Sequence, residues 1–160
     1  MKKNVFFLAL VLAVLALAAG PVSAQTCNGA SATITGTAGD DALYGTSGVD
    51  VVVGNGGNDD IFTFASDDSA CGDTGHDWVE GGNGNDYIRG YGNWDTLTGN
   101  EDNDTIDANY GEDEVHGNYG NDLIYGGPDS DILWGGPGTD WLDGGTGADY
   151  CIDGETLVSC

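Results

Sequence analysis

Basic side chains are almost missing from this 160-residue chain, which has three Lys and Arg residues against 27 Asp and Glu. Lys2 and Lys3 lie at the very start, so residues 25–160 hold Arg89 alone against all 27 acids, a formal charge of −26. Nucleic acids and anionic membranes are bound by basic residues that face phosphate groups. The composition therefore argues against both partners and favours cations or neutral surfaces.

Long apolar runs are also scarce. The only one covers residues 5–19, which is short for a membrane span. A basic start precedes it, and Val22, Ser23 and Ala24 place small residues where a signal peptidase reads the chain. We expect residues 1–24 to be a signal peptide cleaved before Gln25, and the mature protein to be secreted without a membrane span. An uncleaved anchor is the alternative.

Proline is rare as well, whereas glycine is abundant, with 29 residues in the chain. A glycine excess without a period would indicate disorder. From Gly36 to Ile152, however, the chain divides into thirteen blocks of nine residues without insertion or deletion. Glycine occupies the first place in eleven blocks and the fourth in nine. A fixed short period of this kind indicates a solenoid.

Two places of the repeat hardly vary. The sixth place is always aspartate: Asp41, Asp50, Asp59, Asp68, Asp77, Asp86, Asp95, Asp104, Asp113, Asp122, Asp131, Asp140 and Asp149. The eighth place is always apolar: Leu43, Val52, Ile61, Ala70, Val79, Ile88, Leu97, Ile106, Val115, Ile124, Leu133, Leu142 and Cys151. We expect a glycine-rich turn over places one to six, then a three-residue strand with the eighth side chain inward.

Two such blocks close one coil of eighteen residues, so stacked coils give two parallel sheets around a thin apolar column. This column is too small to stabilise a domain of this size unaided. The aspartates would stack at strand spacing along each edge and repel one another. Ca²⁺ takes six to eight carboxylate and carbonyl oxygens in flexible geometry, whereas Mg²⁺ demands a stricter octahedron. The pattern therefore predicts several calcium ions between the coils.

The repeat resembles the RTX, or hemolysin-type, calcium-binding nonapeptide GGxGxDxUx, in which U is a large aliphatic residue. Residues 55–60 and 81–86 are close copies of its turn. The resemblance implies an all-β, right-handed parallel β-roll with two repeats per turn, in which Ca²⁺ lies between blocks two apart. Together with the apolar start, the repeat predicts four segments: a signal peptide (1–24), an N-terminal capping coil (25–35), the β-roll (36–152) and a C-terminal cap (153–160).

The implied calcium ligands are the sixth-place aspartates, with a gap around Asp68, because block 63–71 has lost both glycines. Asn93, Asp102 and Asp129 also replace the fourth-place glycine. The strongest neighbouring pairs are expected to be Asp41 with Asp59, Asp59 with Asp77, Asp122 with Asp140, and Asp131 with Asp149. The full set of predicted ligands is Asp41, Asp50, Asp59, Asp77, Asp86, Asp95, Asp104, Asp113, Asp122, Asp131, Asp140 and Asp149.

Export would permit disulfides, and the four cysteines allow three pairings that spacing alone does not decide. Cys151 and Cys160 both fall at eighth places, so a bridge between them would close the C-terminal end. Cys27 and Cys71 would then tie the N-terminal coil to the degenerate fourth block. Ile34 keeps the eighth-place phase in that coil.

The sequence holds no HExxH or GxSxG motif, and few residues lie outside the repeats, so we expect a monomeric binding or structural protein and no enzyme. A calcium-assisted polysaccharide-processing enzyme is a weaker alternative. Outward aromatic residues raise a further one, binding to a glycan or cell surface. They group as Tyr44 with Phe62, Trp134 with Tyr150, and Tyr125 with Trp141. Cross-strand bracing of the sheet would explain the same residues.

Overall fold

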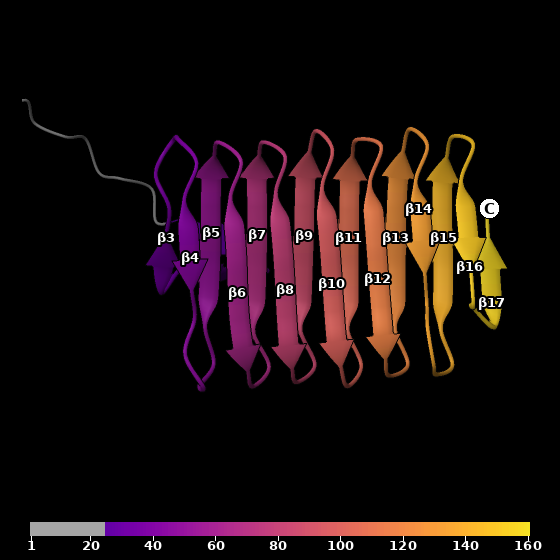
Figure 1. The fold of residues 1–160 in the computed structure, drawn as a ribbon, viewed down its shortest axis with the longest axis horizontal. Coiled ribbons are helices and arrows are strands. Elements are labelled where there is room, and N and C mark those ends of the chain that lie inside the picture. Colours follow the sequence, from indigo (N-terminus) through magenta and orange to yellow (C-terminus); the bar gives the residue numbers. More distant parts are fainter. Residues whose placement is uncertain (1–24) are drawn as a thin grey trace, which may run out of the picture.

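Two facing parallel β-sheets form the molecule in a computed structural model that describes residues 25–160. The predicted signal peptide lies outside the described residues. Strands alternate between the sheets along the chain, so that successive coils stack side by side (Figure 1). This arrangement confirms the predicted all-β parallel β-roll. No helix in the described part of the chain is long and apolar enough to cross a membrane.

One sheet has seven strands and the other has eight. The seven-stranded sheet contains β4 (Ala42–Tyr44), β6 (Asp60–Ala65), β8 (Trp78–Asn83), β10 (Thr96–Glu101), β12 (Glu114–Tyr119), β14 (Ile132–Trp134) and β16 (Tyr150–Ile152). The eight-stranded sheet contains β3 (Ile34–Thr35), β5 (Val51–Gly56), β7 (Ser69–Thr74), β9 (Tyr87–Gly92), β11 (Thr105–Tyr110), β13 (Leu123–Pro128), β15 (Trp141–Thr146) and β17 (Thr156–Val158).

The register of these strands confirms two repeats per coil. Leu97 on β10 pairs with Val79 on one side and Val115 on the other, each eighteen residues away. The eighth-place side chains therefore form one continuous column between the sheets, and most of them are fully buried. Ile34 pairs with Val52 and packs against this column, as its phase predicted.

The strands are longer than the sequence predicted. Most of them cover six residues, from the seventh place of one block to the third place of the next. The alternation of the strand therefore continues past the eighth place, so that the first-place glycine also faces inward and the second-place residue faces outward. The turn is confined to places four to six.

Short strands mark repeats with a different turn. β14 stops at Trp134 and is followed by Gly135, Gly136 and Pro137. Pro128 takes the same third place within the six-residue β13, so Pro137 does not by itself account for the short strand. β3 and β4 are also short, and they lead into the two repeats whose second residue is threonine, Thr37 and Thr46.

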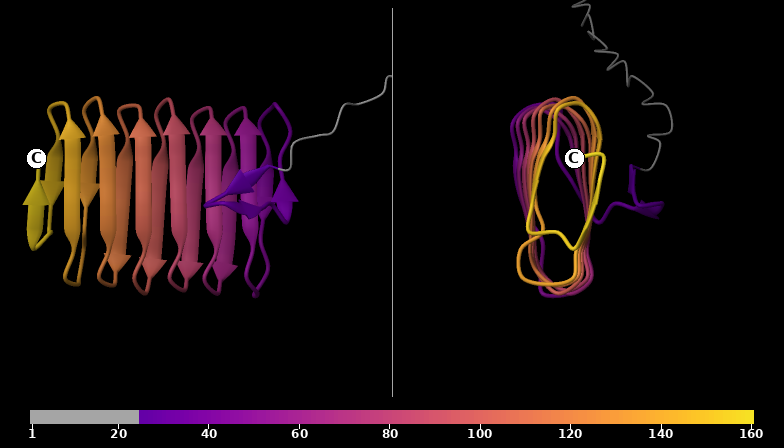
Figure 2. Two further views of the ribbon diagram at one scale, coloured as in Figure 1. Left: turned by 180° about the vertical axis from the view of Figure 1, so that it is seen from behind. Right: turned by 90° about the vertical axis from the view of Figure 1, so that its right-hand side faces the viewer.

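A small antiparallel hairpin, β1 (Thr26–Cys27) and β2 (Ala30–Ser31), replaces the first part of the predicted capping coil. It lies on the outer face of the eight-stranded sheet rather than in phase with the coils (Figure 2). Cys27 forms the expected disulfide with Cys71, and both cysteines are buried against Val51 and Val53. The hairpin therefore covers an apolar patch on this sheet.

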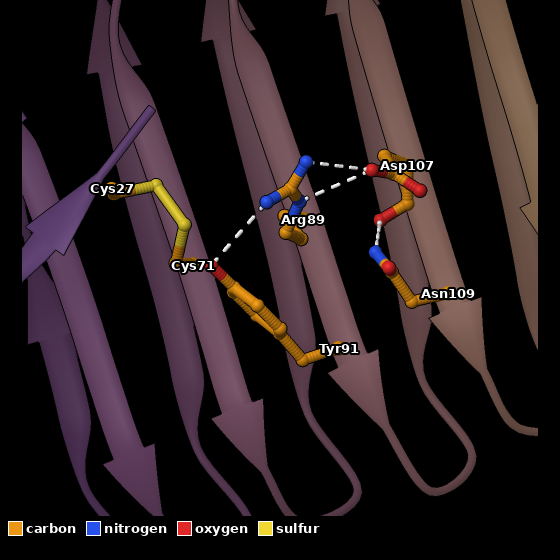
Figure 3. Close-up of a disulfide and its surroundings, with 6 residues drawn as sticks. All are labelled: Cys27, Cys71, Arg89, Tyr91, Asp107 and Asn109. Atoms are coloured by element: carbon orange, nitrogen blue, oxygen red, sulfur yellow. Dashed lines mark hydrogen bonds and ion pairs between the residues drawn. A yellow bond between two sulfur atoms is a disulfide. The ribbon is translucent and has the colours of Figure 1, made fainter. Parts of the chain in front are cut away.

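Arg89 extends this covered patch along the same face (Figure 3). Its guanidinium group donates to Asp107 Oδ2 at 2.8 Å and lies 5.4 and 5.1 Å from the ring centroids of Tyr87 and Tyr91. Both rings also pack on the cluster that contains Cys27. The one basic side chain of the described residues is thus engaged within the protein.

The C-terminal end is closed by the second expected disulfide, Cys151–Cys160, with Cα atoms 5.8 Å apart. The predicted phase is wrong here, because Leu157 pairs with Leu142 and so takes the eighth place. The last coil is three residues shorter than the others, and exposed Cys160 follows β17 instead of entering the core. The bridge therefore crosses the mouth of the apolar column.

Candidate metal sites

The sixth-place aspartates lie along the two long edges of the roll. Each one directly precedes a strand, so one edge holds the aspartates before the seven-stranded sheet and the other holds those before the eight-stranded sheet. Almost all of them are buried, with Asp95 fully inaccessible to solvent. Aspartates one coil apart are linked: the backbone N–H of Asp77 donates to Asp95 Oδ1 at 2.9 Å. The same bond joins all eleven pairs of same-edge neighbours from Asp41 to Asp149, at 2.7–3.0 Å.

The second oxygen of these carboxylates lacks any hydrogen-bond donor in most repeats. It is buried and unpartnered in Asp59, Asp68, Asp77, Asp86, Asp95, Asp104, Asp113, Asp122, Asp131, Asp140 and Asp149. Leaving a buried carboxylate oxygen unpaired is costly, and the cost is removed when the group is protonated or bound to a cation. Each of these Oδ2 atoms therefore lacks the proton or cation that would compensate its charge.

Burial has a large effect on the acidity of the same groups. It raises the pKa of Asp95 and Asp104 to about 8, and that of Asp86 and Asp131 to about 7. The hydrogen bond to Oδ1 opposes this shift, whereas the neighbouring aspartates add to it by repulsion. The carboxylates of the middle coils therefore resist ionisation at neutral pH unless a cation compensates.

First-place glycines leave main-chain oxygens beside these carboxylates. A Cβ atom added to Gly126 would lie 2.5 Å from Asp131 Oδ2 and 2.8 Å from the carbonyl oxygen of Gly144. For Gly135 the corresponding distances are 2.6 Å to Asp140 Oδ2 and 2.5 Å to the carbonyl oxygen of Asp153. A side chain here would push between the two oxygens, so glycine keeps the carboxylate and the carbonyl facing a common space.

The oxygen set fits a hard cation such as Ca²⁺, which accepts carboxylate and peptide carbonyl oxygens. No group of three or more acidic, His or Cys side chains within residues 25–160 comes together closely enough to hold a metal. Side chains alone therefore do not complete a site. The main-chain carbonyls of the turns would have to supply the remaining ligands, as the repeat pattern predicted.

Two repeats differ from this arrangement. In the first, the backbone N–H and Oγ1 of Thr37 donate to Asp41 Oδ2 at 2.6 and 2.8 Å. In the second, Thr46 makes the same two bonds to Asp50 Oδ2, at 2.6 and 2.9 Å. Both predicted ligands thus already have donors from their own repeat. The second-place threonine, which the sequence interpretation did not consider, is the distinguishing signal.

The degenerate fourth block is more regular than its sequence suggests. Asp68 Oδ1 accepts from the N–H of Asp50 at 2.7 Å, and its Oδ2 is unpartnered like those of its neighbours. Ser66 takes a positive φ at the fourth place, as do the other non-glycine residues Asn93, Asp102 and Asp129. Asn and Asp tolerate this conformation better than most residues, so the substitutions preserve the turn. The carboxylate ladder continues through Asp68, although the predicted gap in metal occupancy there stays a prediction.

Glu155 is a further member of the ladder that the sequence interpretation missed. Its Oε2 accepts the backbone N–H of Asp140 at 2.6 Å, the bond that a following repeat would make through its aspartate. The shortened last coil brings Glu155 to this place directly before β17. A glutamate thus ends one ladder.

The fold and site define a parallel β-roll with regularly spaced buried carboxylates. The family model for the RTX calcium-binding nonapeptide repeat (4 copies) matches residues 28–70, 72–106, 91–122, 107–142 and 116–151. The chain belongs to this family, and its repeats bind Ca²⁺. No curated protein and no solved structure matches it.

Proposed function

We propose that this protein is a secreted, disulfide-closed module that folds when its sixth-place aspartates bind calcium. The eleven unpartnered Oδ2 atoms from Asp59 to Asp149 are the observation that carries the proposal. Apart from Asp68, where a gap is predicted, these carboxylates would hold ions between coils through Oδ2 and turn carbonyls. Asp41 and Asp50 already accept hydrogen bonds from threonine. Binding to the folded state alone adds stability through mass action. The activity is then binding rather than catalysis.

Circular dichroism of the oxidised chain from Gln25 to Cys160 tests this proposal. Without Ca²⁺ we expect a largely disordered spectrum, and with Ca²⁺ a cooperative gain of β structure that chelator reverses. Calorimetry should report several ions per chain. An unchanged β-rich spectrum in chelator, together with no measurable calcium binding, would overturn the proposal.

Partly exposed aromatic pairs favour glycan or cell-surface binding as a second function. Trp134 stacks on His116 with centroids 4.4 Å apart, and Tyr125 meets Trp141 edge to face at 5.1 Å. Exposed aromatic groups of this kind often mark partner surfaces. Trp134→Ala and Trp141→Ala, tested separately for retention on polysaccharide or whole cells, should each weaken binding if their sheet carries the partner. Equal retention of parent and both variants would assign these pairs to bracing of the sheets.

A further inference from the structure

The outer face of the seven-stranded sheet is the uncovered face of the roll, since the hairpin and Arg89 lie on the other sheet. Three aromatic rings gather at its N-terminal end. The ring of Tyr44 lies 5.5 Å from that of Phe62 with an interplanar angle of 10°, and 6.4 Å from that of Phe64 with an angle of 13°. The three rings are thus nearly parallel and form one aromatic platform.

Phe64 takes part in this platform at a conformational cost. Its φ is +76°, a region that bulky L-residues rarely adopt, and its side chain is 51% exposed. The second place of other repeats mostly holds Gly, Asn or Asp at a similar positive φ, residues that accept this conformation readily. Backbone strain of this kind clusters at functional sites, where the surrounding structure maintains it.

A groove of about 280 Å³ opens beside the rings. The residue that pairs with Phe64 on the neighbouring strand is Gly82, which has no side chain, and the next residue in that row is Asn100. The missing side chain leaves the Phe64 ring uncovered on the side that faces β8. The side chains that line the groove are Phe62, Phe64, Glu80, Asn83, Asn100 and Glu101.

We propose that this groove binds a neutral hexopyranose glycan, which places the second proposed function at a particular site. The apolar C–H face of a pyranose ring can lie on the aromatic platform, while its hydroxyls donate to the carboxylates of Glu80 and Glu101 and bond to the amides of Asn83 and Asn100. Pockets that combine an apolar floor with a few convergent polar groups suit such a ligand.

Charge selects a neutral sugar over an acidic one. Two carboxylates border the groove, and Arg89 lies on the other sheet, paired with Asp107. A uronate or sulfated chain would meet only repulsion here. Glu80 is already oriented, because Trp78 Nε1 donates to its Oε1 at 3.2 Å. A protein partner is the competing occupant of the same surface.

Retention on insoluble polysaccharide in the presence of Ca²⁺ tests the proposal. The parent chain should bind microcrystalline cellulose or chitin and should not bind polygalacturonate. Competition with soluble cello-oligosaccharides and chito-oligosaccharides then shows which of the two neutral polysaccharides the groove prefers. Phe64→Gly should reduce retention at least tenfold while leaving thermal stability equal or higher, because glycine relieves the positive φ. Tyr110→Ser, which removes an exposed aromatic of the other sheet, is the matched control and should retain full binding.

The outcomes separate the site from the wider function. Undiminished binding by Phe64→Gly with loss in Trp134→Ala would overturn this site and leave glycan binding in place. Failure of the parent to bind either neutral polysaccharide, or equal binding to polygalacturonate, would overturn the neutral-glycan site. Failure to bind polysaccharide and whole cells alike would overturn the second proposed function as well, while the calcium-dependent fold would be unaffected. Capture of a protein partner that Phe64→Gly abolishes, without polysaccharide binding, would assign the platform to protein recognition and also overturn the proposal.

Discussion

The first two repeats and the eleven that follow share the same sixth-place aspartate and use it differently. In residues 36–53 the carboxylate accepts hydrogen bonds from a threonine four residues earlier. From Asp59 onward the equivalent oxygen is buried without a donor. The conserved position of the aspartate therefore does not decide whether a repeat needs a cation. We expect the second-place residue to do so, because threonine donates to the carboxylate, whereas the second-place residues of the other eleven repeats take a positive φ and leave its Oδ2 without a donor.

The largest expected effect is that of pH on the repeats with unpartnered carboxylates. Burial raises the pKa of Asp95 and Asp104 to about 8, above the value of about 3.9 in an unfolded chain. A raised carboxyl pKa means that the ion-free fold is stabilised at acidic pH and loses that stability as pH rises from about 4 to about 8. Calcium-free protein should therefore show more β structure by circular dichroism at pH 4.5 than at pH 8, where we expect it to be largely disordered.

Calcium should reverse this trend, because the ion competes with protons for the same oxygens. Apparent affinity should rise between about pH 5 and pH 8, and calorimetry in buffers of different ionisation enthalpy should detect proton release on binding. Ion-free protein that is more stable at pH 8 than at pH 4.5 would contradict the assignment of these carboxylates as uncompensated.

The second largest effect should come from replacing one aspartate in each group of repeats, the first two and the eleven that follow, and comparing bound calcium and stability. Asp95→Asn keeps a carbonyl oxygen for the N–H of Asp77 but removes the charge. We expect fewer bound ions and a loss of roughly 3–4 kcal/mol per lost site when free Ca²⁺ is about 100 to 1,000 times Kd. In chelator the same variant should be more stable than the parent, because a buried charge is gone.

Asp41→Asn is the matched control in the first group. The amide oxygen can still accept from Thr37, so we expect an unchanged number of ions and a stability change within about 1 kcal/mol. Equal losses of bound calcium in the two variants, measured by calorimetry, would remove the distinction between the groups.

The smallest effect should be the conversion of one group into the other. Thr46→Asn removes the hydroxyl that bonds Asp50 and introduces a residue that accepts positive φ, as Asn55 does in the next repeat. We expect one additional calcium ion per chain, with little change in stability. Thr46→Val also lacks the hydroxyl but disfavours positive φ, so it should add none. Identical stoichiometry for the asparagine variant and the parent would refute the role given to the second place.

Period and chemistry explain how much of the molecule could be predicted from its sequence. The nine-residue period was sufficient to predict the two sheets, the eighteen-residue coil and the apolar column from Val52 to Leu142. A place that is apolar in every repeat must face inward. Strand length was wrong because the first-place glycine has no side chain to show that its position is buried. As a result Phe64 was placed in a turn, although it lies on an outward face of β6.

The ends of the roll were less predictable than its middle. The disulfide partners followed from the phase, but the phase itself fails after Ile152, where a three-residue shortening moves Leu157 into the core position. The hairpin over the eight-stranded sheet follows from apolar Val51 and Val53, which interrupt the outward polar pattern. Neither feature repeats, so periodicity offers no signal for it.

The shortened last coil also determines where the roll stops. Stacked coils expose an unpaired sheet edge at each end, and such an edge can pair with the edge of another molecule. Here Glu155 accepts the backbone N–H of Asp140, which lies one coil earlier, and the Cys151–Cys160 disulfide ties the chain back across the opening. A second molecule would meet a narrower coil without the spacing of the repeats. We therefore expect the irregular C-terminal coil to oppose end-to-end stacking of two rolls into a filament.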